Sequence, residues 1–323
     1  MSIICNLNNL PQDITNSVVT IGNFDGVHRA HQKIFKKIIA RARDLHGTSV
    51  VITFEPHPIK VMFPTKAKPL ITLLEQKKEL IINQGIDLLL IIGFTKEFAA
   101  ISAEDFIKDI LVDKLGVKEI VVGYDYAFGH SRQGNVEVLR EMGSVFNFNV
   151  QQVDPVYVEN VLVSSTSIRN LVMEGNLVGA KKLLGRNYQI RGKVIRGMNR
   201  GGSLLGYPTA NLRLTDELIP KEGVYIVLID IGGKTYQGLT NIGYNPTFKD
   251  KTLSVETYIF NLSANIVNQK IKVNFLSHLR DEITFASTKE LSRQIDQDVN
   301  QAREFFQKKK IHYEMEILAW SFN

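Results

Sequence analysis

The feature that most constrains this chain's fold is an alternation of short apolar runs with amphipathic segments through its first half. The apolar runs, rich in β-branched residues, are predicted strands at 18–21, 49–54, 88–93, 120–123 and 149–153. Three segments of helical periodicity accompany them, at 31–45, 73–83 and 103–115. The alternation predicts an α/β fold with a parallel, doubly wound sheet covered by helices on both faces. Such sheets bind ligands at the carboxyl ends of their strands.

The pattern changes after about residue 185. From Tyr188 to Phe275 the apolar segments are short and alternating, and glycine-rich or asparagine-rich turns separate them. These features predict antiparallel strands in a barrel or a sandwich. A long helix is predicted from Thr288 to about Lys309. We therefore expect two domains, residues 1–185 and 186–323.

Charge, apolar content and cysteine count exclude several classes of protein. The net charge of +6 is spread along the chain, and its one cluster, Lys308-Lys309-Lys310, is typical of a solvated helix face. The longest apolar run, 88–94, is much shorter than the roughly 20 residues of a membrane span. The single cysteine, Cys5, excludes an internal disulfide and multi-cysteine metal sites. We expect a cytoplasmic protein with no membrane or nucleic-acid partner, in which oxygen atoms or histidines would hold any metal.

The segment GNFDGVHRAH leads from the first predicted strand into the first predicted helix. Gly22 and Gly26 allow the backbone to approach a phosphate, and the helix N-terminus offers free N–H groups and a positive dipole. His28 and His31 share a face of the first turn and can donate hydrogen bonds to phosphate oxygens. An isolated HxxH is more often an ordinary surface pair, but the position after the first strand favours phosphate binding.

Three further loops fall where strands of this sheet end, so we expect them to converge on one crevice. TFEPHP follows the second strand, GYDYAFG follows the fourth, and SSTSIR begins a helix after the last strand. Aromatic residues of the second loop suit a planar ring, although core aromatics beside a turn have the same spacing. Hydroxyls and an arginine at a helix start can donate hydrogen bonds to a phosphate, although a simple N-cap explains any one serine.

Together GNFDGVH with its HxxH continuation, TFEPHP, VGYDYAFG and SSTSIR resemble the adenylyltransferase half of the bacterial bifunctional riboflavin kinase/FAD synthetase family. The resemblance implies a Rossmann-like nucleotidyltransferase sheet on which FMN attacks the α-phosphorus of ATP, giving FAD and pyrophosphate. It implies that ATP contacts Gly22, Asn23, Phe24, Asp25, Gly26, His28, His31, Ser164, Thr166 and Arg169. It implies that the flavin contacts His57, Pro58, Asp125, Tyr126 and Phe128. The family usually has glycine where this chain has Ala30, a small residue and a good helix former.

In the second half, the motif PTAN and a lone glutamate stand out. Thr209 and Asn211 project to the same face of an extended segment and offer hard oxygen ligands suited to Mg²⁺, although a turn after proline is an alternative. Glu256 shares a face of its predicted strand with the apolar Tyr258 and Phe260. A glutamate on such a face is either an edge charge or a general base for an alcohol.

PTAN, NIGYNPTF and the VETYIF strand resemble the riboflavin kinase half of the same family, in the same order. The resemblance implies a small antiparallel β-barrel with a terminal helix, which transfers the γ-phosphate of ATP to riboflavin. Glu256 would be the general base, and Thr209 and Asn211 would bind Mg²⁺ with the nucleotide. The implied ATP-binding residues of the kinase are Gly197, Gly206, Tyr207, Pro208, Thr209, Asn211 and Asn241. The family usually has arginine where this chain has Gly202, although Arg200 lies two residues earlier.

The resemblance extends over roughly residues 15 to 305 and predicts an enzyme that makes FMN from riboflavin and FAD from FMN, with ATP and Mg²⁺. Two alternatives stay open at this stage. One is a different nucleotidyltransferase with an accessory barrel, against which PTAN and Glu256 argue. The other is a catalytically inactive flavin-binding or nucleotide-binding regulator, suggested by Ala30 and Gly202. Retention of both histidines and of the proposed base argues against the regulator.

Overall fold

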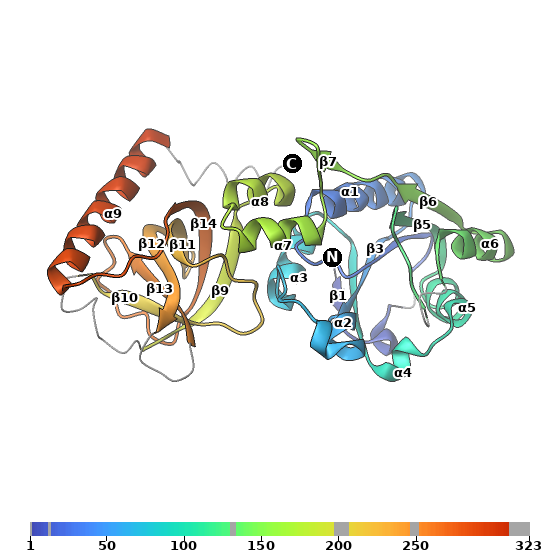
Figure 1. The fold of residues 1–323 in the computed structure, drawn as a ribbon. Coiled ribbons are helices and arrows are strands. Elements are labelled where there is room, and N and C mark those ends of the chain that lie inside the picture. The colour runs from blue at the N-terminus through green and yellow to red at the C-terminus, as the bar shows by residue number, and fades with distance from the viewer. Residues whose placement is uncertain (1, 12–13, 130–133, 197–206, 246–251, 310–323) are drawn as a thin grey trace. The chain divides into compact units, whose positions relative to one another are not determined.

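The computed structural model describes residues 2–11, 14–129, 134–196, 207–245 and 252–309. Its chain divides into two compact units, Met1–Ser165 and Thr166–Asn323 (Figure 1). The predicted domain boundary, after residue 185, lies further along the chain than this division at Ser165. The boundary between the two catalytic domains stays a prediction.

The first unit contains the predicted parallel sheet. Its six strands are β1 (Ser2–Ile4), β2 (Ser17–Ile21), β3 (Ser49–Glu55), β4 (Leu88–Gly93), β5 (Val117–Gly123) and β6 (Asn149–Val153). They pair in the order β1-β4-β3-β2-β5-β6, and every pair is parallel. The five predicted strands are confirmed, whereas β1 was not predicted, because three residues are too few to show an alternation.

Helices cover both faces of this sheet, as the doubly wound prediction requires. On one face, α1 (Arg29–Asp44) and α3 (Leu74–Ile82) pack buried side chains such as Phe35 and Ile81 against Val18 and Val51. On the other face, the π-helix η3 (Phe106–Val112) and α6 (Val136–Phe146) pack against alternate strand residues such as Val19. Each such fully buried side chain contributes about 1.5–3 kcal/mol through the hydrophobic effect.

Short elements connect these layers in the first unit. They are η1 (Leu7–Asn9), α2 (Pro58–Met62), η2 (Pro64–Lys66), α4 (Lys96–Ala99), α5 (Ala103–Asp105), β7 (Tyr157–Val158) and β8 (Val161–Leu162). The predicted helix at 103–115 is formed by α5 and η3 together. Ser102 caps it, because its Oγ accepts a hydrogen bond from the Asp105 amide at 3.0 Å.

The second unit is a closed antiparallel barrel, so the resemblance decided correctly between barrel and sandwich. Its strands are β9 (Tyr188–Ile195), β10 (Thr209–Arg213), β11 (Gly223–Ile231), β12 (Lys234–Asn245), β13 (Thr252–Ile259) and β14 (Lys270–Arg280). They close in the order β10-β13-β12-β11-β14-β9. Its helices are α7 (Ser165–Met173), α8 (Leu177–Leu184) and α9 (Thr288–Lys309), the last as predicted.

Strand residues of the barrel alternate between its interior and a face covered by α9. Val255 and Thr257 are buried, whereas Tyr258 and Phe260 pack with Val299 of α9. Glu256 therefore lies on the helix-covered side of the barrel wall, at the margin of that apolar contact. Among the described residues, no helix combines the length and apolar character needed to span a membrane.

Candidate functional sites

The loop after β2 lies where the direction of strand order reverses. From β2 the chain winds through β3 to β4 on one side, and β5 and β6 extend the sheet on the other side. In open α/β sheets this switch point, at the carboxyl ends of the strands, is where ligands bind. The loops that follow β2 and β5 are the ones predicted to bind phosphate and flavin.

The loop after β2 is held in an unusual backbone conformation. Phe24, Gly26 and Val27 all have positive φ angles, of 47°, 87° and 40°. The Asp25 carboxylate accepts hydrogen bonds from the amides of Thr72 at 3.0 Å and Ile71 at 3.2 Å, and the Gly26 amide donates to Thr72 Oγ1 at 3.0 Å. Non-glycine residues persist in this region only where surrounding contacts fix them. The Asp25 carboxylate is thus engaged in shaping the loop, so any contribution to ATP binding would come through the loop's shape.

The two predicted histidines meet at the start of α1. His28 is the N-cap residue and is buried, and its ring stacks on that of His31 with centroids 3.5 Å apart and planes at 20°. The Phe24 ring packs edge-on against His31 at 5.1 Å and against Phe35 at 4.9 Å. A Cβ atom at Gly22 would lie 3.0 Å from the Phe24 ring, so this glycine makes room for the packing. The arrangement places two imidazoles at the positive end of a helix dipole.

The start of the SSTSIR motif contacts the loop after β2. Ser165 Oγ donates a hydrogen bond to the Asp25 carbonyl at 2.9 Å, so the start of SSTSIR lies against the GNFDG loop. Ser164 precedes it and is half-buried. Thr166 and Arg169 lie on α7, of which every residue after Ser165 belongs to the second unit.

The TFEPHP loop ends in a short helix. His57 caps α2, because its Nδ1 accepts a hydrogen bond from the Ile59 amide at 3.3 Å, and Pro58 occupies the first helical position. With Nδ1 as acceptor, the neutral imidazole carries its proton on Nε2.

The aromatic side chains after β5 are packed at the edge of the core. Tyr126 stacks on Phe128 with centroids 5.4 Å apart, and Phe128 lies 5.9 Å from Phe106. Burial raises the pKa of Tyr126, and its buried hydroxyl has no hydrogen-bond partner among the described residues. Asp125 is exposed in the same loop. The rings therefore combine core packing with a donor that a bound ligand could satisfy.

A residue that sequence reasoning missed is Lys77 of α3. Its side chain is buried, and Nζ donates hydrogen bonds to the Asn23 carbonyl at 3.1 Å and to Thr53 Oγ1 at 3.4 Å. Burial lowers the pKa of this lysine. The available signal was its position on the same helix face as Leu80 and Ile81, where an apolar residue is the usual choice.

The predicted kinase residues form a continuous row across three strands of the barrel. Cross-strand pairing places Glu256 of β13 directly between Asn211 of β10 and Asn241 of β12. Thr209 Oγ1 donates to Glu256 Oε2 at 3.3 Å, and Ser254 Oγ donates to Glu256 Oε1 at 3.1 Å. The proposed base is thus held by two hydroxyls, one of them on a proposed magnesium ligand.

A second carboxylate lies beside this row. A Cβ atom at Gly243 would collide with Oε1 of Glu282, and the Asn241 side-chain amide lies 3.6 Å from the same point. Glu282 follows β14, and nothing in its sequence surroundings distinguishes it from a surface glutamate. It brings one more hard oxygen donor to the neighbourhood of Asn241.

Other predicted kinase residues lie at the margin or outside the described part. The Tyr207 ring packs edge-on against Tyr258 at 5.1 Å and its hydroxyl donates to Asp296 of α9, while Pro208 is exposed. Gly197 and Gly206 lie outside the described residues, together with Gly202 and residues 246–248 of the NIGYNPTF turn.

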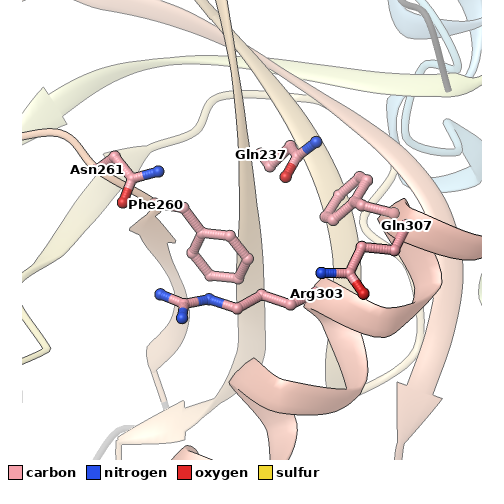
Figure 2. A pocket seen from close by; sticks show the side chains of 6 residues that line it. Gln237, Phe260, Asn261, Arg303 and Gln307 are labelled. Carbon is pink, nitrogen blue, oxygen red and sulfur yellow. The ribbon is translucent and has the colours of Figure 1, made fainter. Parts of the chain in front are cut away.

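A hollow of about 310 Å³ lies elsewhere on the barrel, between its wall and α9 (Figure 2). Its lining residues are Gln237, Phe260, Asn261, Arg303, Phe306 and Gln307. Arg303 lies over the Phe260 ring, 5.8 Å from its centroid, so an intramolecular cation–π contact occupies this surface. None of the predicted site residues lines it.

Comparison with known proteins assigns both halves of the chain. A family model for FAD synthetase matches residues 10–167, and a model for riboflavin kinase matches residues 184–306. The bifunctional riboflavin kinase/FMN adenylyltransferase of Buchnera aphidicola from Acyrthosiphon pisum is 38% identical over 309 residues, which are 95% of this chain and 98% of the relative. The chain belongs to the bifunctional riboflavin kinase/FMN adenylyltransferase family.

Further relatives of this family agree over nearly the whole length. The bifunctional riboflavin kinase/FMN adenylyltransferase of Escherichia coli K12 is 35% identical, covering 94% of this chain and 96% of its own. A solved structure from Streptococcus pneumoniae, named a macrolide-efflux protein, superimposes with a TM-score of 0.83 at 32% identity, covering 94% and 98%. The fold is therefore shared with that solved structure over 94% of this chain.

Proposed function

We propose that this chain catalyses two successive reactions, each at a site of its own. The barrel transfers the γ-phosphate of ATP to riboflavin, giving FMN and ADP, and the parallel-sheet unit joins FMN to the AMP part of ATP, giving FAD and pyrophosphate. The observation that carries the proposal is the coincidence of two separate residue constellations with the two matched family regions. Riboflavin, FMN, ATP and FAD are then its substrates and products.

In the adenylyltransferase, the FMN phosphate is already an anion near neutral pH and needs little help from a general base. Its oxygen forms a bond to the α-phosphorus of ATP, and the bond from that phosphorus to the leaving pyrophosphate breaks. The barrier comes from bringing negative charges together, so electrostatic stabilisation dominates. His28 and His31, at the N-terminus of α1, would stabilise these phosphates, with Gly22–Gly26 as the backbone cradle and Ser164, Thr166 and Arg169 holding the ATP tail.

The flavin of FMN would bind at the loops after β3 and β5. The Tyr126 hydroxyl supports this assignment, because it is buried and has no hydrogen-bond partner among the described residues. The isoalloxazine ring carries carbonyl and ring-nitrogen acceptors that such a donor can satisfy. His57, Pro58, Asp125 and Phe128 would complete the contact surface.

In the kinase, Glu256 would take the proton of the riboflavin 5′-hydroxyl as its oxygen attacks the γ-phosphorus and the bond to ADP breaks. Thr209 and Asn211 would hold Mg²⁺ with the ATP phosphates, and Tyr207, Pro208, Asn241 and the glycines at 197 and 206 would contact the nucleotide. The oxygen donors present fit this ion, since Mg²⁺ uses few protein ligands and keeps several waters. Bound Mg²⁺ would supply charge neutralisation between the phosphates.

We further propose a cytoplasmic enzyme whose partners are small molecules, with no nucleic-acid or membrane partner. The even spread of its basic residues and the water-soluble substrates of both reactions support this proposal. The predicted boundary after residue 185 is retained as the start of the kinase part.

The test is a time course with purified protein, riboflavin, ATP and Mg²⁺, in which riboflavin, FMN and FAD are separated by chromatography. Wild-type protein is expected to form FMN first and FAD second. Glu256→Gln is expected to lower riboflavin phosphorylation by about 10²–10⁴-fold, because general-base help is lost, while FAD formation from supplied FMN continues.

The exposed Glu222 provides a matched control, since Glu222→Gln removes the same charge from the barrel without touching the row around Glu256. Undiminished FMN formation by Glu256→Gln would remove Glu256 from the role of base. Binding of riboflavin or FMN by wild-type protein without any conversion would favour the inactive regulator.

A further inference from the structure

We propose that Lys77 is a positioning residue of the adenylyltransferase, whose buried ammonium fixes the Asn23 carbonyl and thereby the strained turn that presents His28 and His31 to the phosphates. The inference rests on the adenylyl transfer proposed for the first unit. Lys77 lies on α3, outside every motif that the sequence and the family resemblance pointed to.

The geometry around the Asn23 carbonyl carries the argument. Lys77 Nζ donates to this oxygen at 3.1 Å, and Thr53 Oγ1 donates to the same oxygen at 3.3 Å. Lys77 Nζ also lies 3.4 Å from Thr53 Oγ1, so the three groups form a closed triangle. Thr53 and Lys77 are both buried; Thr53 lies on β3, which pairs with β2, and Lys77 lies on α3, which packs on one face of the same sheet. The triangle therefore ties the Asn23 carbonyl to the strand β3 and to the helix α3.

The fixed carbonyl lies at the residue where the backbone becomes strained. Asn23 is followed by Phe24, with a φ of 47°, and the turn continues through Gly26 and Val27 into the N-cap His28. On the far side of Phe24, Asp25 and Gly26 are held by Ile71 and Thr72. Lys77 thus supplies the anchor that precedes the strained turn, and the segment 71–72 supplies the anchor within it. Removing one anchor frees the turn to relax toward ordinary φ angles.

A lysine is a costly choice at this position unless its charge is used. Lys77 shares the buried face of α3 with Leu80 and Ile81, where leucine or methionine would pack without desolvating a charge. The charged groups that face it are Glu55 at the end of β3 and Asp25 in the loop, and both favour the protonated form. Its charge offsets two carboxylates beside a loop that must receive a polyphosphate.

The test compares Lys77→Met with Lys78→Met in the full-length enzyme. Lys78 is the next residue of α3 and pairs with Glu75 at 2.9 Å on the outer side of the helix, so it controls for loss of a lysine from this helix. Lys77→Met is expected to lower kcat/KM for FMN adenylylation by about 100-fold, as misplaced catalytic groups do. Riboflavin phosphorylation by the same protein should be unchanged, and Lys78→Met should match wild type in both reactions.

A pH profile separates this role from a merely structural one. Because burial lowers the pKa of Lys77, wild-type adenylylation should decline on the alkaline side at a pH below the roughly 10.4 of an ordinary lysine. Folded, weakly active Lys77→Met should lack that decline, while Lys78→Met keeps it. A loss of rate in Lys77→Met with an unaltered alkaline decline would assign Lys77 a structural role and overturn the proposal.

The remaining outcomes are also decisive. Adenylylation by folded Lys77→Met within twofold of wild type would overturn the inference while leaving the proposed function intact. Absence of FAD formation by wild-type protein would instead overturn the proposed function. Should Lys77→Met lose its folded circular dichroism spectrum, Thr53→Val replaces it, since it removes one corner of the triangle at nearly constant volume. Slower adenylylation with normal phosphorylation supports the proposal, and an unchanged rate overturns it.

Discussion

At the scale of single residues, His28 and His31 are useful to the proposed chemistry because their neighbours leave them few conformations. Stacking holds the two rings 3.5 Å apart, and the Phe24 ring packs on His31 from the side. A donor that is already in place when charge develops on a phosphate costs little reorganisation at the moment of reaction. This preorganisation, and not basicity, is the property that an alanine substitution should remove.

His28→Ala is therefore expected to lower FAD synthesis by about 10²–10³-fold, the usual effect of deleting one preorganised donor. Riboflavin phosphorylation should continue, so FMN accumulates when riboflavin and ATP are supplied. Chromatographic separation of the flavins over time measures both steps. The exposed His46, which has a φ of 47°, provides a control as His46→Asn, since asparagine tolerates that conformation. A fall of both activities in folded His28→Ala would contradict two separate sites.

The sequence pointed to those candidate site residues that belong to local patterns. His28 and His31 follow a strand at helical spacing, and Glu256 interrupts an apolar face, so each is visible in a window of a few residues. Lys77 and Glu282 lie beside the candidate sites only because residues far apart in the sequence pack together. A single lysine or glutamate in an amphipathic segment gives no local signal of such packing. Tyr126 shows the same limit, because spacing alone does not distinguish a core ring from a ligand contact.

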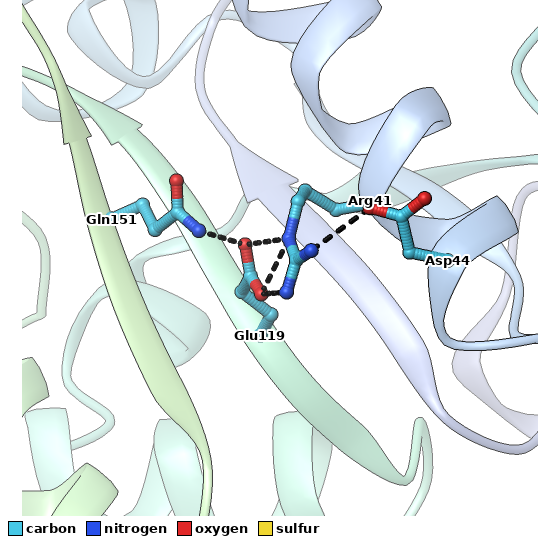
Figure 3. A network of polar contacts seen from close by, with 4 residues as sticks. All are labelled: Arg41, Asp44, Glu119 and Gln151. Carbon is cyan, nitrogen blue, oxygen red and sulfur yellow. Dashed lines mark hydrogen bonds and ion pairs between the residues drawn. The ribbon is translucent and has the colours of Figure 1, made fainter.

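At the scale of elements, a polar cluster in the first unit joins the helix α1 to the strands β5 and β6 (Figure 3). The Arg41 guanidinium binds both oxygens of the fully buried Glu119, at 2.9 Å for the shortest contact, and Gln151 Nε2 donates to Glu119 Oε1 at 2.6 Å. Hydrogen bonding to Glu119 raises the pKa of Arg41. α1, whose N-terminus carries both histidines, is thereby tied near its C-terminus to the sheet.

Arg41→Met is expected to lower the free energy of unfolding, because it leaves the buried Glu119 carboxylate without its cation. The double variant Arg41→Met/Glu119→Gln should recover much of that stability, since it removes the uncompensated charge as well. Asp44→Asn is the control, because the Arg41 contact to Asp44 is exposed and contributes little. Urea unfolding followed by circular dichroism measures all three. Equal stability of Arg41→Met and Asp44→Asn would contradict the assignment.

Most elements near the site were predictable for a physical reason. Strands buried on both faces read as continuous apolar runs, so β2 to β5 were found within a few residues of their ends. The sequence pattern of the second unit did not distinguish a barrel from a sandwich. Alternation of apolar residues shows that one face of a strand is buried, but it does not show how the sheet closes. The π-helical form of η3 and the short strand β1 depend on tertiary packing and leave no local signal.

At the scale of the whole molecule, we expect that a fragment of the chain can carry the kinase reaction alone. The helix α8 decides where such a fragment should begin. This helix buries Leu177, Leu183 and Leu184, and it contacts β9 and β14 of the barrel. Each leucine contributes about 1.5–3 kcal/mol when fully buried. A fragment that begins at Thr166 retains this cover, whereas one that begins at Arg186 exposes the barrel surface beneath it.

Both fragments, 166–323 and 186–323, are expected to phosphorylate riboflavin and to form no FAD, because Thr209, Asn211 and Glu256 all lie on the barrel. The fragment 186–323 should unfold at a lower temperature, since it loses the buried leucines of α8 while its row of kinase residues is untouched. Thermal unfolding followed by circular dichroism, together with chromatography of the flavins, measures the two properties independently. Equal melting temperatures would show that α8 adds nothing to the barrel's stability. A folded 166–323 fragment without kinase activity would show that riboflavin phosphorylation needs residues of the first unit.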